Sequence, residues 1–303
     1  MHGHCGLAVI LVSEGKPKQS QPRVALMVVA MPIGNDADLS PRAIDALRTA
    51  DVIAAEDTRR IARVLAAHSI STPCVSCHEH NERARADELV ARMKSGDVVA
   101  LVTDAGTPAI SDPGYWLVRA ALDAGLRVSA VPGPSAMIAA LSMAGIATDR
   151  FAFEGFLPAR GSARDARLNE IAFEQRTTVF YEAARRIPDT LRAMADAFGA
   201  GREAAVVREI SKTYEETVRG TLGELANRYA SAAPLGEITI VVAGASEEDA
   251  LASRRTYGLT VERLMRANVS LKDASTIVAE VTGRPRREVY NDALKRGANR
   301  SEE

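Results

Sequence analysis

Apolar residues in the first half of the chain form short, nearly continuous runs, separated by segments with helical spacing. The runs cover residues 24–30, 52–55, 98–102 and 128–131 and are rich in valine, leucine and alanine. Strands buried on both faces of a parallel sheet have this composition, because neither face meets water. Strands that alternate with helices indicate βαβ units, so the pattern predicts an α/β domain with a mainly parallel sheet.

The segments between these runs carry helix starts and stops. Ser40 and Pro41 fit the N-cap and the first position of a helix, and apolar residues at positions 43, 44, 47 and 50 give that helix one buried face. Glycine is a frequent stop just beyond a helix. Further helices are expected from an Asp57 or Thr58 cap, from an Asn81 cap to Lys94 with Gly96 as its stop, from Asp112-Pro113 to Gly125, and after Ser135.

The second half has a different rhythm, in which some strands follow one another directly. Strands are expected at residues 151–153, 178–181, 204–207, 216–220 and 237–242, and helices at residues 163–173, 187–198 and 222–231. Hairpin-like successions of this kind predict a mixed sheet. The expected organisation is a disordered extension at residues 1–22, α/β domains at residues 23–133 and 134–246, and a small helical tail at residues 257–298.

Composition narrows the class of protein. The chain has 303 residues, of which 47% are hydrophobic and 25% charged, with a net charge of -1. No apolar run approaches the roughly 20 residues of a membrane span, and the first 22 residues lack the pattern of a signal peptide. Three cysteines with no framework spacing favour a reducing compartment. We therefore expect a cytoplasmic protein without a membrane partner, in which a local patch would meet any polyanion.

One short motif suggests a metalloprotein. Cys74, Cys77 and His78 match the spacing of c-type haem attachment, and His80 would complete the ligands for half of a zinc site. These four residues crowd into seven positions, however, and no second ligand pair follows. We interpret the cysteines as small, partly buried thiols and expect no metal.

Three loops at the carboxyl ends of predicted strands are built from glycine, proline and small hydroxyl residues. They cover residues 31–35, 103–114 and 132–135. Ligands of open α/β sheets bind at this edge, and small residues let the backbone approach a ligand closely. None of the loops carries the dinucleotide fingerprint GxGxxG or the phosphate loop GxxxxGK[ST]. Together they predict a ligand site of another kind.

Several longer segments carry a family resemblance, in chain order: VVAMPIGNDADLSPRAIDALRTADVIAAEDTRR, HEHNE, ALVTDAGTPAISDPG, VPGPSAMIAAL and TDRFAFEGFLP. The chain resembles the bacterial small-subunit rRNA cytidine 2′-O-methyltransferases of the tetrapyrrole methylase superfamily, from about Val24 to Leu294. The resemblance implies a class III methyltransferase that uses S-adenosyl-L-methionine. It also implies two α/β domains over a cofactor cleft, a homodimer, and 16S rRNA or the small ribosomal subunit as the substrate. HEHNE belongs to this family pattern, so the haem-like spacing beside it is accidental.

The resemblance also implies site residues. Those expected to bind the cofactor are Pro32, Gly34, Asp104, Ala105, Gly106, Thr107, Pro108, Ile110, Ser111, Ser135, Ala136, Phe180, Tyr181, Ala183 and Thr239. The family often has Tyr-Glu-x-Pro-His-Arg where this chain has Tyr181-Glu182-Ala183-Ala184-Arg185-Arg186. Both the proline and the histidine of that pattern are replaced, so neither can be essential in this chain.

Methyl transfer to a ribose hydroxyl benefits from a nearby base. The titratable candidates in the family-like segments are Glu56, Asp57, Glu79, His80, Asp104, Glu182 and Lys212. Asp104, Glu182 and His80 are taken as the catalytic candidates, although each carboxylate has an ordinary structural alternative such as a helix cap or an ion pair, and His80 could be a surface histidine. The backbone of RNA requires cations. Candidates are Arg59, Arg60, Arg160, Arg284, Arg286 and Arg287. Two rival functions remain open: a precorrin-type tetrapyrrole methylase, and a module that binds the cofactor without catalysis.

Overall fold

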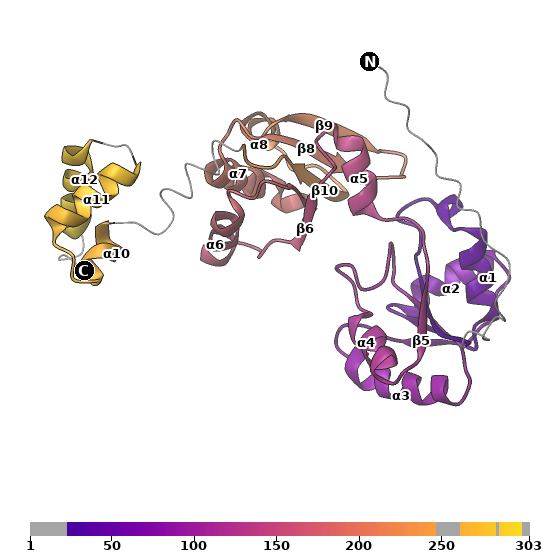
Figure 1. Ribbon diagram of the computed structural model, residues 1–303. Coiled ribbons are helices and arrows are strands. Elements are labelled where there is room, and N and C mark those ends of the chain that lie inside the picture. The colour runs from indigo at the N-terminus through magenta and orange to yellow at the C-terminus, as the bar shows by residue number, and fades with distance from the viewer. Residues whose placement is uncertain (1–22, 247–260, 283–284, 299–303) are drawn as a thin grey trace, which may run out of the picture. The chain divides into compact units, whose positions relative to one another are not determined.

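The computed structural model describes residues 23–246, 261–282 and 285–298 (Figure 1). It divides into two compact units. Unit 1 contains the first strand and residues 40–132, and unit 2 contains residues 31–39 together with the chain from Gly133 onward. The predicted extension at residues 1–22 lies outside the described residues, and so do residues 247–260, which include the start of the predicted tail.

The sheet of unit 1 is entirely parallel, as its apolar runs predict. Its strands run in the order β3-β2-β4-β1-β5. Their bounds are β1 (Val24–Val29), β2 (Val52–Ala55), β3 (Cys74–Ser76), β4 (Val99–Val102) and β5 (Arg127–Val131). Every residue of β2 and β4 is buried, which explains why these two strands read as unbroken apolar runs.

The helices of unit 1 are α1 (Pro41–Thr49), α2 (Thr58–Ala67), α3 (Glu82–Lys94) and α4 (Tyr115–Asp123). Ser40 caps α1 by accepting the Ala43 amide, and Asp57 caps α2 by accepting the Arg59 amide, as expected. Leu89 of α3 and Leu117 of α4 pack with Leu101 of β4 in one core cluster.

In unit 1 the predicted start of α4 is wrong, and that of α3 is right in position but not in how the helix is capped. Helix α4 begins at Tyr115 and not at Pro113, because Gly114 has a φ of 132°, which no helix accommodates. Asn81 stands at the start of α3, but its side chain makes no capping hydrogen bond and instead accepts the amide of His78. The local sequence therefore predicts where these helices lie, but not how their first turns are formed.

The sheet of unit 2 is mixed, in the order β6-β7-β10-β8-β9. Its strands are β6 (Phe151–Phe156), β7 (Thr177–Ala183), β8 (Glu203–Arg208), β9 (Glu216–Thr221) and β10 (Glu237–Val242). Only β6 and β7 run parallel, and the other neighbouring pairs are antiparallel. The short helical element η1 (Asp36–Asp38) also belongs to this unit.

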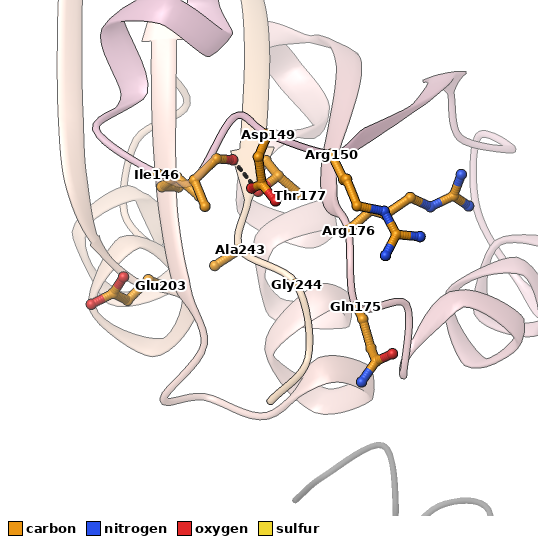
Figure 2. Close-up of a pocket in the computed structure, with 10 residues that line it drawn as sticks. Ile146, Asp149, Arg150, Gln175, Arg176, Thr177, Glu203, Ala243 and Gly244 are labelled. Atoms are coloured by element: carbon orange, nitrogen blue, oxygen red, sulfur yellow. Dashed lines mark hydrogen bonds between the residues drawn. The ribbon is translucent and has the colours of Figure 1, made fainter. Parts of the chain in front are cut away.

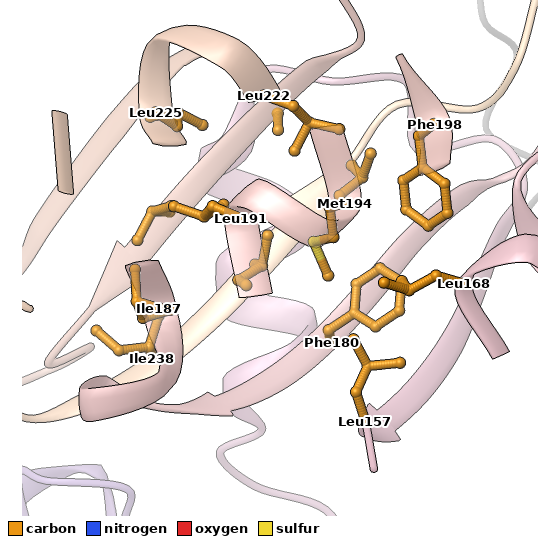
Figure 3. Close-up of a cluster of buried hydrophobic side chains, with 14 of the residues drawn as sticks. Leu157, Leu168, Phe180, Ile187, Leu191, Met194, Phe198, Leu222, Leu225 and Ile238 are labelled. Carbon is orange, nitrogen blue, oxygen red and sulfur yellow. The ribbon is translucent and has the colours of Figure 1, made fainter. Parts of the chain in front are cut away.

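Helices cover both faces of this second sheet. They are α5 (Ala136–Ala144), α6 (Ser162–Ile171), η2 (Ala184–Arg186), α7 (Ile187–Phe198) and α8 (Leu222–Tyr229). Figure 3 shows the cluster in which α6, α7 and α8 meet the sheet around the fully buried Phe180. Helix α5 packs on the opposite face, where Leu141 joins Val179 and Val241. Burying each large apolar side chain contributes roughly 1.5–3 kcal/mol, so these two clusters hold the unit together.

The C-terminal part of the chain forms a small helical cluster. It contains α10 (Val261–Arg266), α11 (Leu271–Thr282) and α12 (Arg286–Ala298). Ser270 caps α11, since its hydroxyl oxygen accepts the amide of Asp273 at 3.1 Å. A small core that includes Val261, Ala274 and Val289 joins the three helices. Among the described residues of the whole chain, no helix has the length and apolar character needed to span a bilayer.

Candidate functional site

The loop after β4, residues 103–114, is the most unusual backbone segment of unit 1. Gly106 and Gly114 have positive φ angles, and so do Ala109 (69°) and Ser111 (62°). For residues with a side chain this left-handed conformation costs about 1–2 kcal/mol each. Such strain persists only where the surrounding structure fixes it, and it clusters at ligand sites. The loop contains seven of the expected cofactor residues, from Asp104 to Ser111.

Asp104 links this loop to the end of β2. Its Oδ1 accepts the amide of Asp57 at 3.2 Å, and its Oδ2 pairs with Arg60 at 3.0 Å. The amide of Asp104 in turn donates to Oε2 of Glu56 at 3.1 Å. The carboxyl ends of β2 and β4 are therefore tied together through acidic side chains.

A further carboxylate, Asp112, was expected only to open a helix. Burial raises the pKa of Asp112 to about 6, and the negative charges of Glu56 and Asp104 add to the effect. These three acidic groups thus act on one another at one edge of the sheet, although they come from separate loops. No local pattern in the sequence reveals this, since Asp112-Pro113 reads as an ordinary helix start.

Replacing Asp112 by asparagine should stabilise unit 1 at pH 8 and change it little near pH 4. Because the pKa of Asp112 is raised from 3.8 to about 6, the folded chain favours the protonated form. Above pH 6 folding must retain a poorly solvated charge, which lowers the free energy of unfolding. As the pH falls from 6 toward 4, the folded carboxyl takes up a proton before the unfolded one, and this stability returns.

Urea unfolding followed by tryptophan fluorescence would measure this effect, since the single tryptophan of the chain, Trp116, lies in unit 1. Asp87→Asn, on the exposed side of α3, is the matched control. A stability difference between wild type and Asp112→Asn that stays constant from pH 4 to pH 8 would contradict the assignment.

Glu82 supports the far end of the same loop, a role that sequence reasoning missed. The residue is 4% exposed, and its Oε1 accepts the amides of Gly114 (2.9 Å), Trp116 (2.6 Å) and Leu117 (3.4 Å). These amides open α4, where Gly114 offers no capping side chain. A carboxylate at a helix N-terminus is favourable both as an acceptor and as a charge. Glu82 comes from HEHNE, so that motif anchors the loop on the far side of Asp112.

The expected residues of unit 2 gather at the carboxyl end of β7. The amide of Met137, in the first turn of α5, donates to the hydroxyl oxygen of Tyr181 at 3.1 Å, next to Ser135 and Ala136. The Tyr181 ring lies 4.9 Å from Phe153 and 5.7 Å from Phe156, measured between ring centroids. Phe156 is 57% exposed, so this aromatic group borders solvent.

Three other expected residues lie beside Tyr181 along β7 and β10. Thr239 stands directly opposite Tyr181 in the sheet and is buried. Phe180 points into the core of the other face, so it can offer a ligand only its main chain. Ala183 ends the strand and is half-buried.

Pro32 and Gly34 belong to residues 31–39, which pack with unit 2. A Cβ on Gly34 would lie 2.4 Å from Cγ of Lys212, and the φ of Gly34 is 153°, so only glycine fits without displacing that side chain. The hydroxyl of Ser211 donates to the carboxylate of Asp38 across the same contact. Lys212 itself pairs with Glu209 at 2.8 Å and Glu237 at 3.0 Å. Burial alone would lower the pKa of Lys212, but these partners outweigh burial and raise it, which argues against a basic role.

The three candidates for a catalytic base lie in different surroundings. Asp104 lies in the strained loop, whereas His80 is exposed on the segment before α3. The side chain of Glu182 is 1% exposed, accepts the hydroxyl of Thr190 at 2.7 Å, and pairs with Arg186 at 3.0 Å. Arg186 also donates to the carbonyl of Leu157. Glu182 is therefore held as an internal anchor on the face opposite Tyr181.

The cysteine motif shows no sign of metal chemistry. Cys77 is buried in the core of unit 1, and burial raises the pKa of its thiol to about 11, with a further contribution from Glu82. Burial also raises the pKa of Cys74. A thiol must lose its proton to bind a metal well. Within the described ranges of the chain, no cluster of three or more His, Cys, Asp or Glu side chains is arranged to hold a metal ion.

The basic candidates are scattered. Arg59 and Arg60 are both well exposed but pair with Asp57 and Asp104, and Arg59 holds the pKa of Asp57 down to about 2. Arg160 is exposed in unit 2. Arg286 and Arg287 begin α12, while Arg284 lies outside the described residues.

A pocket of about 310 Å³ lies elsewhere in unit 2 (Figure 2). It is lined by the start of β7, at Thr177, and by Ala243 and Gly244 just after β10. None of the expected site residues contributes to it. It lies at the end of β7 opposite Ala183 and is distinct from the candidate site.

Comparison with known proteins identifies the family. The model of the family described as Tetrapyrrole (Corrin/Porphyrin) Methylases matches residues 25–226, and that of the RsmI C-terminal HTH domain matches residues 258–297. A Xylella fastidiosa protein named Ribosomal RNA small subunit methyltransferase I is 47% identical, covering 88% of this chain and 97% of its own length. A Pseudomonas aeruginosa protein of the same name is 46% identical over 89% and 97%. The chain belongs to the ribosomal RNA small subunit methyltransferase I family of tetrapyrrole methylases.

The fold of this family member agrees with solved structures. A uroporphyrin-III C-methyl transferase from Thermus thermophilus, solved in complex with S-adenyl homocysteine, matches with a TM-score of 0.51. The match covers 72% of this chain and 97% of that protein. Because the two sequences are only 22% identical, it supports the fold alone. The predicted family is confirmed, and so is the predicted class III α/β fold with one parallel and one mixed sheet.

Proposed function

We propose that the chain transfers a methyl group from S-adenosyl-L-methionine to the ribose 2′-hydroxyl of a cytidine in the decoding region of small-subunit 16S rRNA. The observation that carries this proposal is the identity of 46–47% over nearly the whole chain to two proteins named Ribosomal RNA small subunit methyltransferase I. The solved neighbour with S-adenyl homocysteine supports the choice of cofactor, since it shares the fold.

The residues present suit a cationic sulfonium cofactor. In unit 1 the negative charges of Glu56, Asp104 and Asp112 gather beside the strained loop, where a positive ligand would relieve their mutual repulsion. In unit 2 the small residues Ser135 and Ala136 adjoin Tyr181, so the backbone there is accessible to a ligand. When bound, the cofactor supplies an electrophilic methyl group, and the protein must align it with the acceptor oxygen.

The acceptor hydroxyl needs a group that takes its proton. A general base works best when its pKa lies near the working pH. Asp112 meets that condition, since its pKa is raised to about 6. We therefore add Asp112 to the candidates Asp104 and His80, and assign Glu182 a structural role because its carboxylate is enclosed by Thr190 and Arg186.

The remaining parts of the proposal concern partners. The chain acts in the cytoplasm as a homodimer, and the basic residues Arg59, Arg60, Arg160, Arg284, Arg286 and Arg287 contact the RNA backbone. The alternative is methylation of a tetrapyrrole, which the name of the structural neighbour suggests. The HTH domain model that matches residues 258–297 favours RNA, because helix-turn-helix modules bind nucleic acids.

Mapping of 2′-O-methyl groups on small-subunit rRNA would test the function, using cells with and without this protein. We expect one cytidine mark to disappear with the protein and to return when it is restored. Calorimetry with the purified chain should show binding of S-adenosyl-L-methionine. An unchanged rRNA map, together with methylation of a tetrapyrrole in vitro, would replace the proposal by its alternative.

A further inference from the structure

The helical tail contains a groove of its own, with a volume of about 500 Å³. Lys272 of α11 and three residues of α12, Arg286, Arg287 and Tyr290, line it. The three cations are exposed, whereas Tyr290 is partly buried. The groove thus combines positive charge with one aromatic surface.

The cations of this groove have no ion-pair partner among the described residues. By contrast, Arg59, Arg92 and Arg176 in the two α/β units each pair with a carboxylate. The two arginines of the groove are therefore available for an external anion.

The position of Arg286 and Arg287 strengthens this argument. They are the first two residues of α12, where the helix dipole is positive and a cation is unfavourable. Their backbone amides have no acceptor among the described residues. Glu288 is the only acid in this first turn. Two arginines at this position weaken the start of the helix. They also place backbone N–H donors and positive charge on one groove, and a phosphate binds to such a combination.

Tyr290 adds a second kind of recognition. It does not belong to the apolar core of the tail, which includes Val278 and Val289. An aromatic side chain beside several cations is the usual arrangement for single-stranded nucleic acid, where an unpaired base stacks on the ring. A base inside a duplex cannot do so.

We propose that this groove binds one unpaired nucleotide of RNA, with its base on Tyr290 and its flanking phosphates on Lys272, Arg286 and Arg287. The choice of RNA as the polyanion rests on the proposed function. The groove shares no residue with those expected to bind the cofactor, so RNA binding and methyl transfer can be measured separately.

Fluorescence anisotropy of the full-length protein with a labelled 12-nucleotide single-stranded RNA would test the groove. Stacking of one base contributes enough that Tyr290→Leu should weaken binding about tenfold, while Tyr290→Phe leaves it unchanged. Replacing Arg286 and Arg287 together by alanine should lower the slope of log affinity against log salt by about 1.4, at about 0.7 per phosphate contact. Arg266→Ala, an exposed arginine at the end of α10, is the control and should have no effect.

Two further measurements make the result decisive. Ultraviolet crosslinking followed by mass spectrometry should place RNA on the peptide that contains Tyr290, and circular dichroism should show that the variants remain helical. Equal affinity of wild type and Tyr290→Leu for the single strand would overturn the proposal, and so would stronger binding of an RNA duplex. Failure of the purified chain to bind S-adenosyl-L-methionine would instead contradict the proposed function, whatever the groove does.

Discussion

Replacing Glu82 by alanine should destabilise unit 1 by about 3 kcal/mol and also weaken cofactor binding. The substitution leaves the amides of Gly114, Trp116 and Leu117 without their acceptor. An unsatisfied buried donor costs about 1–3 kcal/mol, and water can reach only part of this site. Urea unfolding followed by the fluorescence of Trp116 reports on this unit, because Trp116 is the only tryptophan.

Two further variants show whether the loss of stability in Glu82→Ala comes from the missing acceptor, from the missing charge, or from any change in this motif. Glu82→Gln keeps one acceptor oxygen and loses only the charge at the helix N-terminus, so it should cost about 1 kcal/mol. Glu79→Ala removes an exposed glutamate of the same motif and should be neutral. If Glu79→Ala and Glu82→Ala unfold at the same urea concentration, Glu82 does not support the loop.

Replacing Asp104 by alanine should weaken binding of S-adenosyl-L-methionine by about 10- to 100-fold, the range expected for losing a charged hydrogen-bond partner. The change removes the acceptor of the Asp57 amide and the partner of Arg60. It also removes negative charge next to the proposed cation. Titration calorimetry measures the affinity, and methyl transfer to RNA should fall in parallel.

Asp104→Asn tests whether the hydrogen bond to the Asp57 amide or the negative charge of Asp104 matters more for cofactor affinity. Its amide oxygen can still accept the Asp57 amide, whereas the ion pair with Arg60 is lost, so we expect an intermediate effect of about tenfold. Asp123→Ala breaks an exposed ion pair with Arg119 in the same unit and should leave affinity unchanged. Full affinity in Asp104→Ala would place the cofactor elsewhere.

The fold followed from the sequence where aliphatic residues dominate a strand. Residues 52–55 and 237–242 were predicted as strands with the bounds that the structure has. The pattern worked because residues 52–55 and 238–242 are all buried, which favours aliphatic side chains along both strands. It failed at the start of α4, where Asp112-Pro113 resembles a helix start but the backbone continues as a loop to Gly114.

The candidate site was less accessible to sequence reasoning, because its supports act over long distances along the chain. Glu82 accepts amides from residues more than 30 positions away, and the pKa of Asp112 is raised first by burial and then by the charges of Glu56 and Asp104. The side chain of Lys212 packs closely against Gly34, which is also far from it along the chain. Helix caps and turns are local patterns, whereas these contacts exist only after the chain has folded. The family resemblance predicted which loops form the site, but not the residues, such as Glu82, that hold those loops in place.

The left-handed backbone at Ala109 and Ser111 has a consequence for ligand uptake. Glycine at either position would ease the strain, but it would also let the loop sample more conformations. With alanine and serine there, held between Asp104 and Gly114, the loop has little freedom left to lose. A ligand that arrives at it therefore meets a preorganised surface, and the entropy penalty of association is correspondingly small.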